Sequence, residues 1–405
     1  MATRLDGAES VLARAGGLLS RLLGSEGQSR AMGRSRWLSN VYLNQLVPAL
    51  LLVLVGAVVI WSASLTIEEA SFPRQLIGIA AGLVCAWLMW RYDYRSLVDM
   101  STVLIVMDVV LILLPNVPGL GVEAKGMTGW VRIPLVGVTF QPSELTKIVT
   151  IFLMASLAAE YNGKIDSLHD YLKLCGILAG VFILMIMQDL GTGLILLVVG
   201  ASIIVCGGAK RTWVLVTLGV VIVGALLVVA TSMVDGLPHI LKTYQLNRLL
   251  VFIDSSVDPT GDGYNLQQAK IAVGSGGFFG KGVGNASQSS GGFLPEAHTD
   301  FVFALFAEEF GFFGSVVLLG LFGWMIFSTV MLAQRIDVPF AKLVLVGVAT
   351  MWAFQVLQNV GMCIGLMPIT GIPLPFISFG SSSLIAQLTA CGMVQSVWHY
   401  RTKAA

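Results

Sequence analysis

Apolar residues occur in this chain as long runs, and polar residues gather in the segments that separate them. A helix needs about 20 apolar residues to cross a hydrocarbon layer of about 30 Å, because its backbone groups must pair within the segment. On that scale the pattern predicts an all-α polytopic membrane protein with ten transmembrane helices. Their expected ranges are 44–65, 74–90, 99–116, 143–159, 171–187, 190–206, 212–233, 301–330, 340–366 and 380–398.

The composition supports a membrane protein. Hydrophobic residues make up 56% of the 405 positions, and charged residues make up only 12%. A water-soluble domain carries about twice that share of charge, because its surface must be solvated. A soluble fold is therefore excluded, and membrane lipids are expected around the helices.

Basic residues indicate which loops face the cytoplasm. The segment before the first helix and alternate short loops carry Arg4, Arg14, Arg21, Arg30, Arg34, Arg36, Arg91, Arg95, Lys164, Lys210, Arg211 and Arg335. By the positive-inside rule these sides are cytoplasmic, and both termini are among them. The intervening loops then face outward, including the two longest, 117–142 and 234–300. The second of these joins helices seven and eight.

The chain is expected to comprise a tail and one membrane domain. Residues 1–40 predict an Arg-rich cytoplasmic tail, residues 41–400 the ten-helix domain with its extracytoplasmic loop 234–300, and residues 401–405 a short cytoplasmic end. The tail lacks an apolar core followed by a small-residue cleavage site, so the first helix is expected to act as the insertion signal. An interfacial helix and a disordered tether both fit the tail's mixture of leucine and arginine.

Asp300 stands where the loop 234–300 enters the eighth helix. A carboxylate at the mouth of a transmembrane helix is partly desolvated, which makes it a better proton acceptor. Asp300 is therefore a candidate general base. An alternative is that Thr299 or Asp300 caps the helix N-terminus. Position alone does not separate the two interpretations.

A second polar group opens the fourth helix. Glu144 and Lys147 are three residues apart and share one helix face. A buried ion pair is costly in a helix bundle unless it binds or positions something, although a structural pair that fixes helix packing is the alternative. Asp189 and Asp108 are further charges in apolar surroundings, and Asp108 is simply explained as protonated and hydrogen-bonded.

Two segments rich in glycine or proline interrupt the helical pattern. The run 274–285, with Lys281, fits either a turn or a cradle whose backbone N–H groups approach a phosphate, although its spacing is not that of a Walker P-loop. The segment 367–383 contains Pro368, Pro373 and Pro375, which forbid a regular helix. Irregular backbone is tolerated at membrane depth only where protein or a watery cavity covers it, so this segment predicts a cleft.

Taken in order, these motifs resemble the SEDS family (shape, elongation, division and sporulation), which includes RodA and FtsW. The segments that carry the resemblance are Phe140-Gln141-Pro142-Ser143-Glu144 with Lys147, Asp189-Leu190-Gly191-Thr192, Tyr244-Gln245 with Arg248, the glycine run 274–284, the stretch 295–301 with Glu308-Glu309, and the stretch 368–375. The resemblance implies a ten-helix peptidoglycan glycosyltransferase. Such an enzyme polymerises lipid II at the outer face of the bacterial cytoplasmic membrane.

The resemblance also implies roles for particular residues. Asp300 matches the family's catalytic aspartate, and Glu144 with Lys147 matches its functional pair. Residues expected to contact saccharide or pyrophosphate are Gln245, Arg248, Lys281, His298, Thr299, Trp130, Asp189, Glu308 and Ser378. The family depends on divalent cations, so Mg²⁺ or Mn²⁺ is expected at the pyrophosphate, with Asp300 as a candidate ligand. No organic cofactor is expected.

Partners and alternatives follow from the same resemblance. A class B penicillin-binding protein, the transpeptidase that crosslinks new strands, is the expected partner, and no nucleic acid is expected. The glycine run 274–284 favours the RodA elongation branch over the FtsW division branch. A lipid II flippase or other transporter and a non-catalytic scaffold of the cell-wall machinery are the alternative functions. Apart from Asp108, the acidic residues gather toward the outer side, which favours chemistry at that surface.

Overall fold

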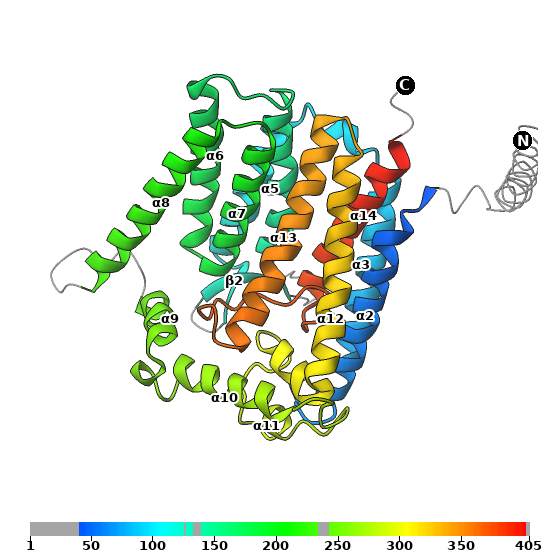
Figure 1. Cartoon of the computed structure of the whole chain (residues 1–405), viewed down its shortest axis with the longest axis vertical. Coiled ribbons are helices and arrows are strands. Elements are labelled where there is room, and N and C mark those ends of the chain that lie inside the picture. The colour runs from blue at the N-terminus through cyan, green and yellow to red at the C-terminus, as the bar shows by residue number, and fades with distance from the viewer. Residues whose placement is uncertain (1–39, 125–126, 133–138, 234–242, 402–405) are drawn as a thin grey trace, which may run out of the picture. The chain divides into compact units, whose positions relative to one another are not determined.

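A computed structural model describes residues 40–124, 127–132, 139–233 and 243–401 (Figure 1). The chain divides into two units, Met1–Tyr42 and Leu43–Ala405, and the helices and strands discussed here belong to the second unit. The predicted cytoplasmic tail and the residues 402–405 lie outside the described residues.

A helix lies in each of the ten apolar ranges. These helices are α2 (Leu43–Ala63), α3 (Phe72–Arg91), α4 (Ser101–Leu113), α5 (Pro142–Ala159), α6 (Leu168–Ile186), α7 (Leu190–Cys206), α8 (Arg211–Ser232), α12 (Val302–Gln334), α13 (Pro339–Cys363) and α14 (Ser381–Tyr400). Among the described residues, seven of them are long and apolar enough to cross a membrane: α2, α3, α5, α6, α8, α12 and α13. The structure is therefore a mostly helical, polytopic membrane protein, and the number of ten crossings stays a prediction.

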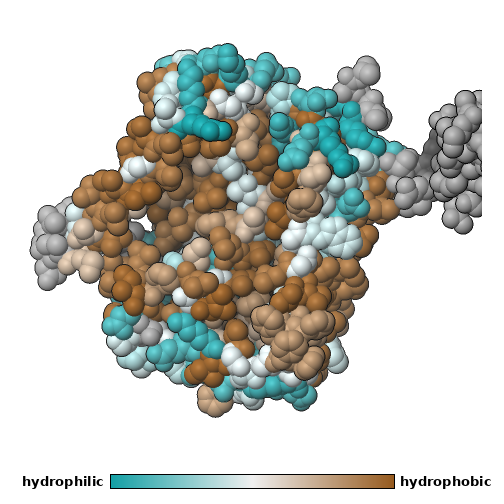
Figure 2. Space-filling view, in the orientation of Figure 1, coloured by the Kyte–Doolittle hydropathy of each residue, from teal (hydrophilic) through white to brown (hydrophobic). Residues whose placement is uncertain are grey.

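The surface of the bundle is apolar around its middle. Figure 2 shows hydrophobic side chains over the central part of the visible face, with hydrophilic ones gathered above and below. Large apolar side chains such as Ile77, Leu215 and Phe327 are about two-thirds exposed. A soluble protein does not expose apolar surface on this scale, so the central region faces lipid.

The extent of burial distinguishes α5, a central helix, from α8, a peripheral one. In α5 nearly every residue from Pro142 to Ala158 is buried, whereas α8 has no buried residue before Ser232. An apolar helix that is buried all round belongs to the centre of a bundle, and one that is exposed all round is solvated by lipid. The polar residues of α5 are therefore surrounded by protein.

The segment before α5 contains a small sheet, which the all-α expectation missed. Strands β1 (Gly121–Ala124), β2 (Met127–Arg132) and β3 (Thr139–Phe140) pair antiparallel in the order β1-β2-β3. Gly121 lies opposite Val131, which in turn lies opposite Phe140. The strands are too short to produce a distinct alternation of polar and apolar residues, so the sequence pattern did not separate them from a loop. Trp130 lies in β2, so the sheet places it near the N-terminus of α5.

The second long loop is largely helical. It contains α9 (Thr243–Ile253), α10 (Asp262–Ser275) and α11 (Ser287–Ser290). The described residues also contain short 3-10 helices, of which η4 (Ser255–Val257) lies in this loop. The others are η2 (Tyr94–Leu97) and η3 (Leu114–Asn116). The predicted loop residues 234–242 lie outside the described part.

The glycine run packs against a kink in α12. Gly311 interrupts the helix with φ +67°, and a Cβ atom there would lie 2.3 Å from the backbone nitrogen of Gly280. The N–H groups of Phe312 and Phe313 donate to the carbonyls of Gly277 and Phe278, at 2.9 and 3.0 Å. The glycines therefore permit close backbone approach to the kink. The N–H groups of Lys281 and Gly282 donate to carbonyls of α12, so the run uses these amides there and not in a phosphate cradle.

Candidate active site

A cavity of about 710 Å³ opens at the end of the bundle that carries the small sheet and the long helical loop. Its lining comes from seven parts of the chain that are distant in sequence. The lining residues are Arg74, Ile77, Trp130, Thr139, Gln141, Glu144, Asp189, Thr192, Ile195, Arg248, Asp262, Thr299, Asp300, Thr370, Gly371, Ile372, Pro373, Phe379, Gly380, Ser381, Ser382 and Ser383. This end of the bundle is called the cavity end. The cleft predicted at residues 367–383 is confirmed.

Three helices begin at the cavity. The N-cap residues Gln141 of α5, Asp189 of α7 and Gly380 of α14 all line it. The N-terminus of a helix carries partial positive charge and favours an anionic ligand. The Asp189 carboxylate already caps α7, so the N-termini of α5 and α14, which have no side-chain cap, are the ones that favour such a ligand. The cavity is thus suited to a negatively charged group even though it contains carboxylates.

Asp300 lies in a tight turn just before α12. Glu296 adopts φ +56°, and its carbonyl accepts hydrogen bonds from the N–H groups of Thr299 and Phe301, both at 3.1 Å. The hydroxyl of Thr299 donates to the Glu296 carboxylate at 2.6 Å. The N-cap residue of α12 is Phe301, so the expectation that Thr299 or Asp300 occupies the cap position is wrong. Asp300 instead lines the cavity.

The turn around Asp300 is bonded to the proline-rich segment. The N–H of Phe379 donates to the carbonyl of His298 at 2.9 Å. The hydroxyl of Ser378 donates to the carbonyl of Thr299 at 2.7 Å and accepts from the N–H of Leu374 at 2.8 Å. These hydrogen bonds join two irregular segments that share no helix or sheet pairing.

A charged pair of groups faces the backbone of Gly371. This glycine has φ +69°, and a Cβ atom added to it would lie 3.4 Å from Oδ2 of Asp300 and 3.9 Å from Nη1 of Arg248. The carboxylate and the guanidinium therefore approach one point on the cavity wall. Nε of Arg248 also lies 3.5 Å from the carboxylate of Asp262, which places a second acid at this wall.

Glu144 and Lys147 form a buried ion pair in α5. The ammonium and carboxylate lie 2.7 Å apart, and the two side chains are 1% and 3% exposed. Glu144 lines the cavity, whereas Lys147 lies three residues further into the helix. The pair thus connects the cavity wall with the interior of the bundle.

Asp189 both caps a helix and lines the cavity. It is the N-cap of α7, where its carboxylate accepts from the N–H of Gly191 at 2.9 Å and from the hydroxyl of Thr192 at 2.5 Å. It also lines the cavity. Gly191 packs against the loop at Thr370, because a Cβ atom there would lie 2.8 Å from the Thr370 carbonyl. Capping therefore fixes this wall of the cavity.

The structure brings together about half of the residues predicted from sequence. Asp300, Glu144, Trp130, Asp189, Arg248 and Thr299 line the cavity. Lys147, Gln245, Lys281, His298, Glu308 and Ser378 are absent from its lining. Gln245 is buried and donates to the Ile186 carbonyl at 3.3 Å, and the ring of His298 lies 5.6 Å from that of Phe379. Direct contact of these six residues with substrate stays a prediction.

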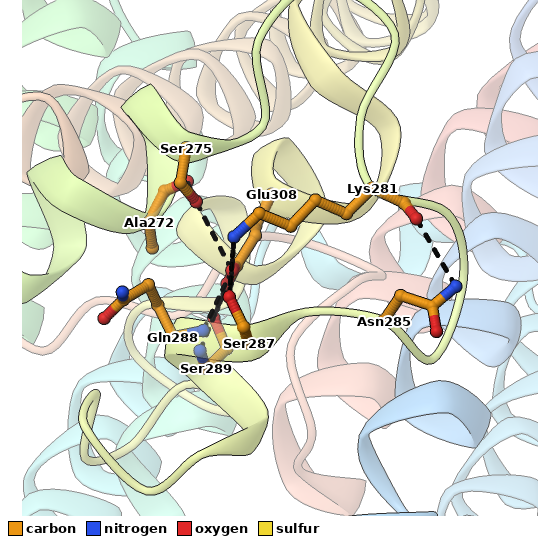
Figure 3. A network of polar contacts seen from close by, with 8 residues as sticks. All are labelled: Ala272, Ser275, Lys281, Asn285, Ser287, Gln288, Ser289 and Glu308. Carbon is orange, nitrogen blue, oxygen red and sulfur yellow. Dashed lines mark hydrogen bonds and ion pairs between the residues drawn. The ribbon is translucent and has the colours of Figure 1, made fainter.

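Lys281 and Glu308 belong to a separate polar network, shown in Figure 3. The fully buried carboxylate of Glu308 lies 2.7 Å from the ammonium of Lys281. It also accepts from the N–H groups of Gln288 and Ser289, at 2.9 and 3.1 Å, and from the hydroxyl of Ser289 at 2.9 Å. The network joins the glycine run and α11 to α12. Both side chains are thereby committed to holding the loop.

Removing the cation from this network should loosen α11. Lys281→Met leaves the buried carboxylate of Glu308 without its ion-pair partner, which should cost about 1–3 kcal/mol of local stability. Hydrogen exchange of residues 281–290 should accelerate in the variant, while exchange in α5 stays unchanged. The matched control is Lys270→Met in α10, which should leave exchange at 281–290 unaltered. Equal exchange in the two variants would contradict a holding role for Lys281.

Several lining residues were missed at the sequence level. The cavity is also lined by residues that were not named as site residues, although some belong to the quoted motifs: Arg74, Gln141, Asp262, Thr370, Ser381, Ser382 and Ser383. Arg74 had a usable signal, because it lies at the predicted outward end of a helix in a protein whose basic residues otherwise favour the opposite side. The serines had none, since hydroxyls at a helix start are ordinary capping residues.

The described residues provide no dedicated metal site. Among residues 40–124, 127–132, 139–233 and 243–401, no group of three or more histidine, cysteine, aspartate or glutamate side chains is placed to hold a metal ion. Glu144 is paired with Lys147 and Asp189 caps α7, so these two acids of the cavity lining are already engaged. The cavity therefore does not fit a divalent cation held by the protein alone. Participation of Mg²⁺ or Mn²⁺ stays a prediction.

The fold and site define a class: a multi-pass helical membrane protein whose helix ends enclose a cavity lined by arginine and carboxylate side chains. The family model for cell cycle proteins of the FtsW, RodA and SpoVE type matches residues 43–403. The chain therefore belongs to this family, the SEDS family, which confirms the resemblance found in its motifs.

Individual relatives agree with the family. The chain is 33% identical over 358 residues to the probable peptidoglycan glycosyltransferase FtsW of Trichlorobacter lovleyi, covering 84% of this chain and 89% of that one. It is 32% identical over 359 residues to the peptidoglycan glycosyltransferase MrdB of Escherichia coli K12, covering 87% and 94%. A solved structure described as "Structural coordination of polymerization and crosslinking by a peptidoglycan synthase complex" contains a similar chain, with a TM-score of 0.74 and 31% identity, covering 89% and 98%.

Proposed function

We propose that this protein polymerises lipid II into glycan strands at the outer face of the bacterial cytoplasmic membrane, with Asp300 as the general base. As a member of the FtsW, RodA and SpoVE family, the chain is a peptidoglycan glycosyltransferase. One observation carries the assignment of the site: Asp300 and Arg248 approach the same point of a cavity enclosed by helix N-termini. A base and a cation are the two groups that this transfer requires.

The proposed chemistry uses them in one displacement. The 4-hydroxyl of a GlcNAc attacks the anomeric carbon of a MurNAc carried on undecaprenyl pyrophosphate, with inversion. Asp300 accepts the hydroxyl proton as the new C–O bond forms. The bond between the anomeric carbon and the pyrophosphate oxygen breaks, and its electron pair leaves with undecaprenyl pyrophosphate. No step of this mechanism passes through a metal ion.

Positive charge near the leaving group comes from the protein. Arg248 and Arg74 line the cavity together with the N-cap residues Gln141 and Gly380. Preorganised donors directed at developing negative charge stabilise a transition state without further reorganisation. Arg74 lies in the first turn of α3, and its carbonyl accepts from the hydroxyl of Ser381, the first residue of α14, at 3.5 Å. This part of the cavity is where we place the pyrophosphate.

Arg74 should accordingly affect substrate binding. Arg74→Gln removes the charge but keeps a polar side chain, and we expect the KM for lipid II to rise about tenfold, corresponding to about 1.4 kcal/mol. The control is Arg91→Gln at the opposite end of the same helix, which should leave KM within about twofold. Initial rates of strand formation over a range of lipid II concentrations measure both. An unchanged KM in Arg74→Gln would exclude Arg74 from the pyrophosphate site.

The polyprenyl chain needs a path from the lipid into the cavity. Ile77 of α3 lines the cavity and is 67% exposed on the apolar surface. This residue supports a lateral opening at α3 through which an anchored substrate enters. The cavity end carries the loops predicted to face outward, and the opposite end carries Arg91, Lys164 and Arg335. This distribution of charge supports an extracytoplasmic active site.

A transpeptidase of the class B penicillin-binding type is the proposed partner. The similar chain in the solved structure belongs to a complex described as a peptidoglycan synthase that coordinates polymerisation and crosslinking. The branch of the family stays a prediction. Relatives named FtsW and MrdB are 33% and 32% identical to this chain, so overall identity does not favour either branch.

The transporter alternative receives less support. A flippase would place acidic residues along a path across the bilayer. Asp108, the residue predicted at mid-helix, is fully buried and accepts a hydrogen bond from Thr150 at 2.9 Å. It is absent from the lining of the cavity, whose acids gather at one end of the bundle. Asp108 is better explained as part of helix packing between α4 and α5.

A further inference from the structure

A single buried amide joins the two walls that meet at Asp300. Asn359 lies in α13 and has 0% exposure. Its Nδ2 atom donates to the carbonyl oxygen of Asp300 at 2.7 Å and to that of Ile372 at 2.8 Å. An asparagine amide has two N–H groups, so both of its donors are used. Asp300 and Ile372 both line the cavity.

Both carbonyls belong to residues outside the helices and strands of the fold. In a continuous helix the carbonyl of Asp300 would accept from the N–H of Ala304, but that group donates to Phe301 at 2.9 Å. Ile372 lies between α13 and α14, in a proline-rich segment that forms no helix or strand. A buried carbonyl needs a donor, and the Asn359 side chain supplies one to each of these two.

We propose that Asn359 is a positioning residue that aligns Asp300 for proton abstraction. The inference rests on the proposed role of Asp300 as the base. Asn359 is absent from the cavity lining, and it acts by fixing the Asp300 backbone against the Gly371-Ile372 wall. The reactive oxygens of the base are thereby held at a set distance from the wall that faces substrate. Because a displacement of about 1 Å can reduce turnover about a hundredfold, such a clamp affects catalysis more than binding.

The preceding residue provides a matched control. Gln358 is also buried in α13, and its Nε2 donates to the carbonyl of Pro368 at 2.8 Å. It thus clamps the same proline-rich segment by the same kind of bond, but four residues before Ile372 and without reaching Asp300. Gln358 and Pro368 are both absent from the cavity lining. Removing the side-chain amide of either Gln358 or Asn359 should loosen the proline-rich segment. Only the loss of Asn359 should also misalign the base.

The experiment compares Asn359→Leu and Asn359→Asp with Gln358→Leu and Gln358→Glu in the full-length protein. Lipid II polymerisation gives kcat and KM, and thermal unfolding gives the stability of each variant. We expect kcat to fall at least tenfold in Asn359→Leu, with a smaller fall in Asn359→Asp, whose protonated form can still donate one hydrogen bond. KM should stay within about twofold. The Gln358 variants should retain kcat within about twofold at a comparable loss of melting temperature.

Each other outcome overturns the proposal. Equal losses of kcat at positions 358 and 359 would show a structural role only, and a raised KM at unchanged kcat would show a role in binding. If Asn359→Leu does not fold, the isosteric Asn359→Asp decides, and wild-type kcat in that variant overturns the clamp. Asp300→Asn is measured in parallel: its full activity would refute the base itself, whereas its inactivity beside fully active Asn359 variants would refute the clamp alone.

Discussion

Replacing Asp300 by Asn should lower the turnover of lipid II polymerisation by about 10²–10⁴-fold. The amide has nearly the same shape as the carboxylate but cannot accept the proton of the attacking hydroxyl, and general base catalysis contributes a factor of this size. Lipid II should still bind, because Arg248, Arg74 and the helix N-termini remain in place. Initial rates of strand formation, together with lipid II binding, separate the two effects.

A second acidic residue provides the control for this variant. Asp254 lies in the turn after α9, where its carboxylate accepts from the N–H and hydroxyl of Ser256. That hydrogen bonding lowers the pKa of Asp254, and the residue is absent from the cavity lining. Asp254→Asn should therefore polymerise lipid II within about twofold of the wild type. A turnover of Asp300→Asn similar to that of Asp254→Asn would contradict the base assignment.

Removing one partner of the buried pair in α5 should produce the largest loss of stability. Lys147→Met leaves the Glu144 carboxylate buried without its cation, and an uncompensated buried charge costs about 3–5 kcal/mol. The free energy of unfolding, measured in detergent micelles, should fall by this amount. Activity should be lost as well, because Glu144 lines the cavity.

The double variant distinguishes a functional pair from a structural one. Glu144→Gln combined with Lys147→Met removes both charges, so most of the lost stability should return. We expect polymerisation to stay low, since the charged pair at the cavity wall is absent. Recovery of both stability and activity would instead assign the pair to helix packing. Stability that does not return in the double variant would show that other contacts dominate.

The helices could be predicted from sequence because a lipid environment imposes a simple rule. A backbone that crosses hydrocarbon must pair its own polar groups, so each apolar run of sufficient length has to be a helix. Loops outside the hydrocarbon layer are exempt from that rule. Trp130 and its neighbours form a strand only because β2 pairs with segments on either side, and such pairing leaves little trace in so short a stretch.

The site was predictable where the chemistry of a residue conflicts with its surroundings. Asp300, Glu144 and Asp189 were found because charges are costly at membrane depth, and all three line the cavity. Lys281 is absent from the lining and pairs with Glu308 in a separate network, so its contact with substrate stays a prediction. Asn359 could not be found, since a buried amide in an apolar helix acquires its meaning only from the two carbonyls that it contacts.

The most direct test of the account is to locate bound lipid II in the inactive Asp300→Asn protein. A lipid II analogue with a photoreactive group beside its pyrophosphate would be crosslinked to this variant and mapped by mass spectrometry of its peptides. The account predicts labelling of peptides that contain Arg74, Arg248 and Ser381. Labelling concentrated on the Lys281–Ser289 segment, away from the cavity, would contradict it.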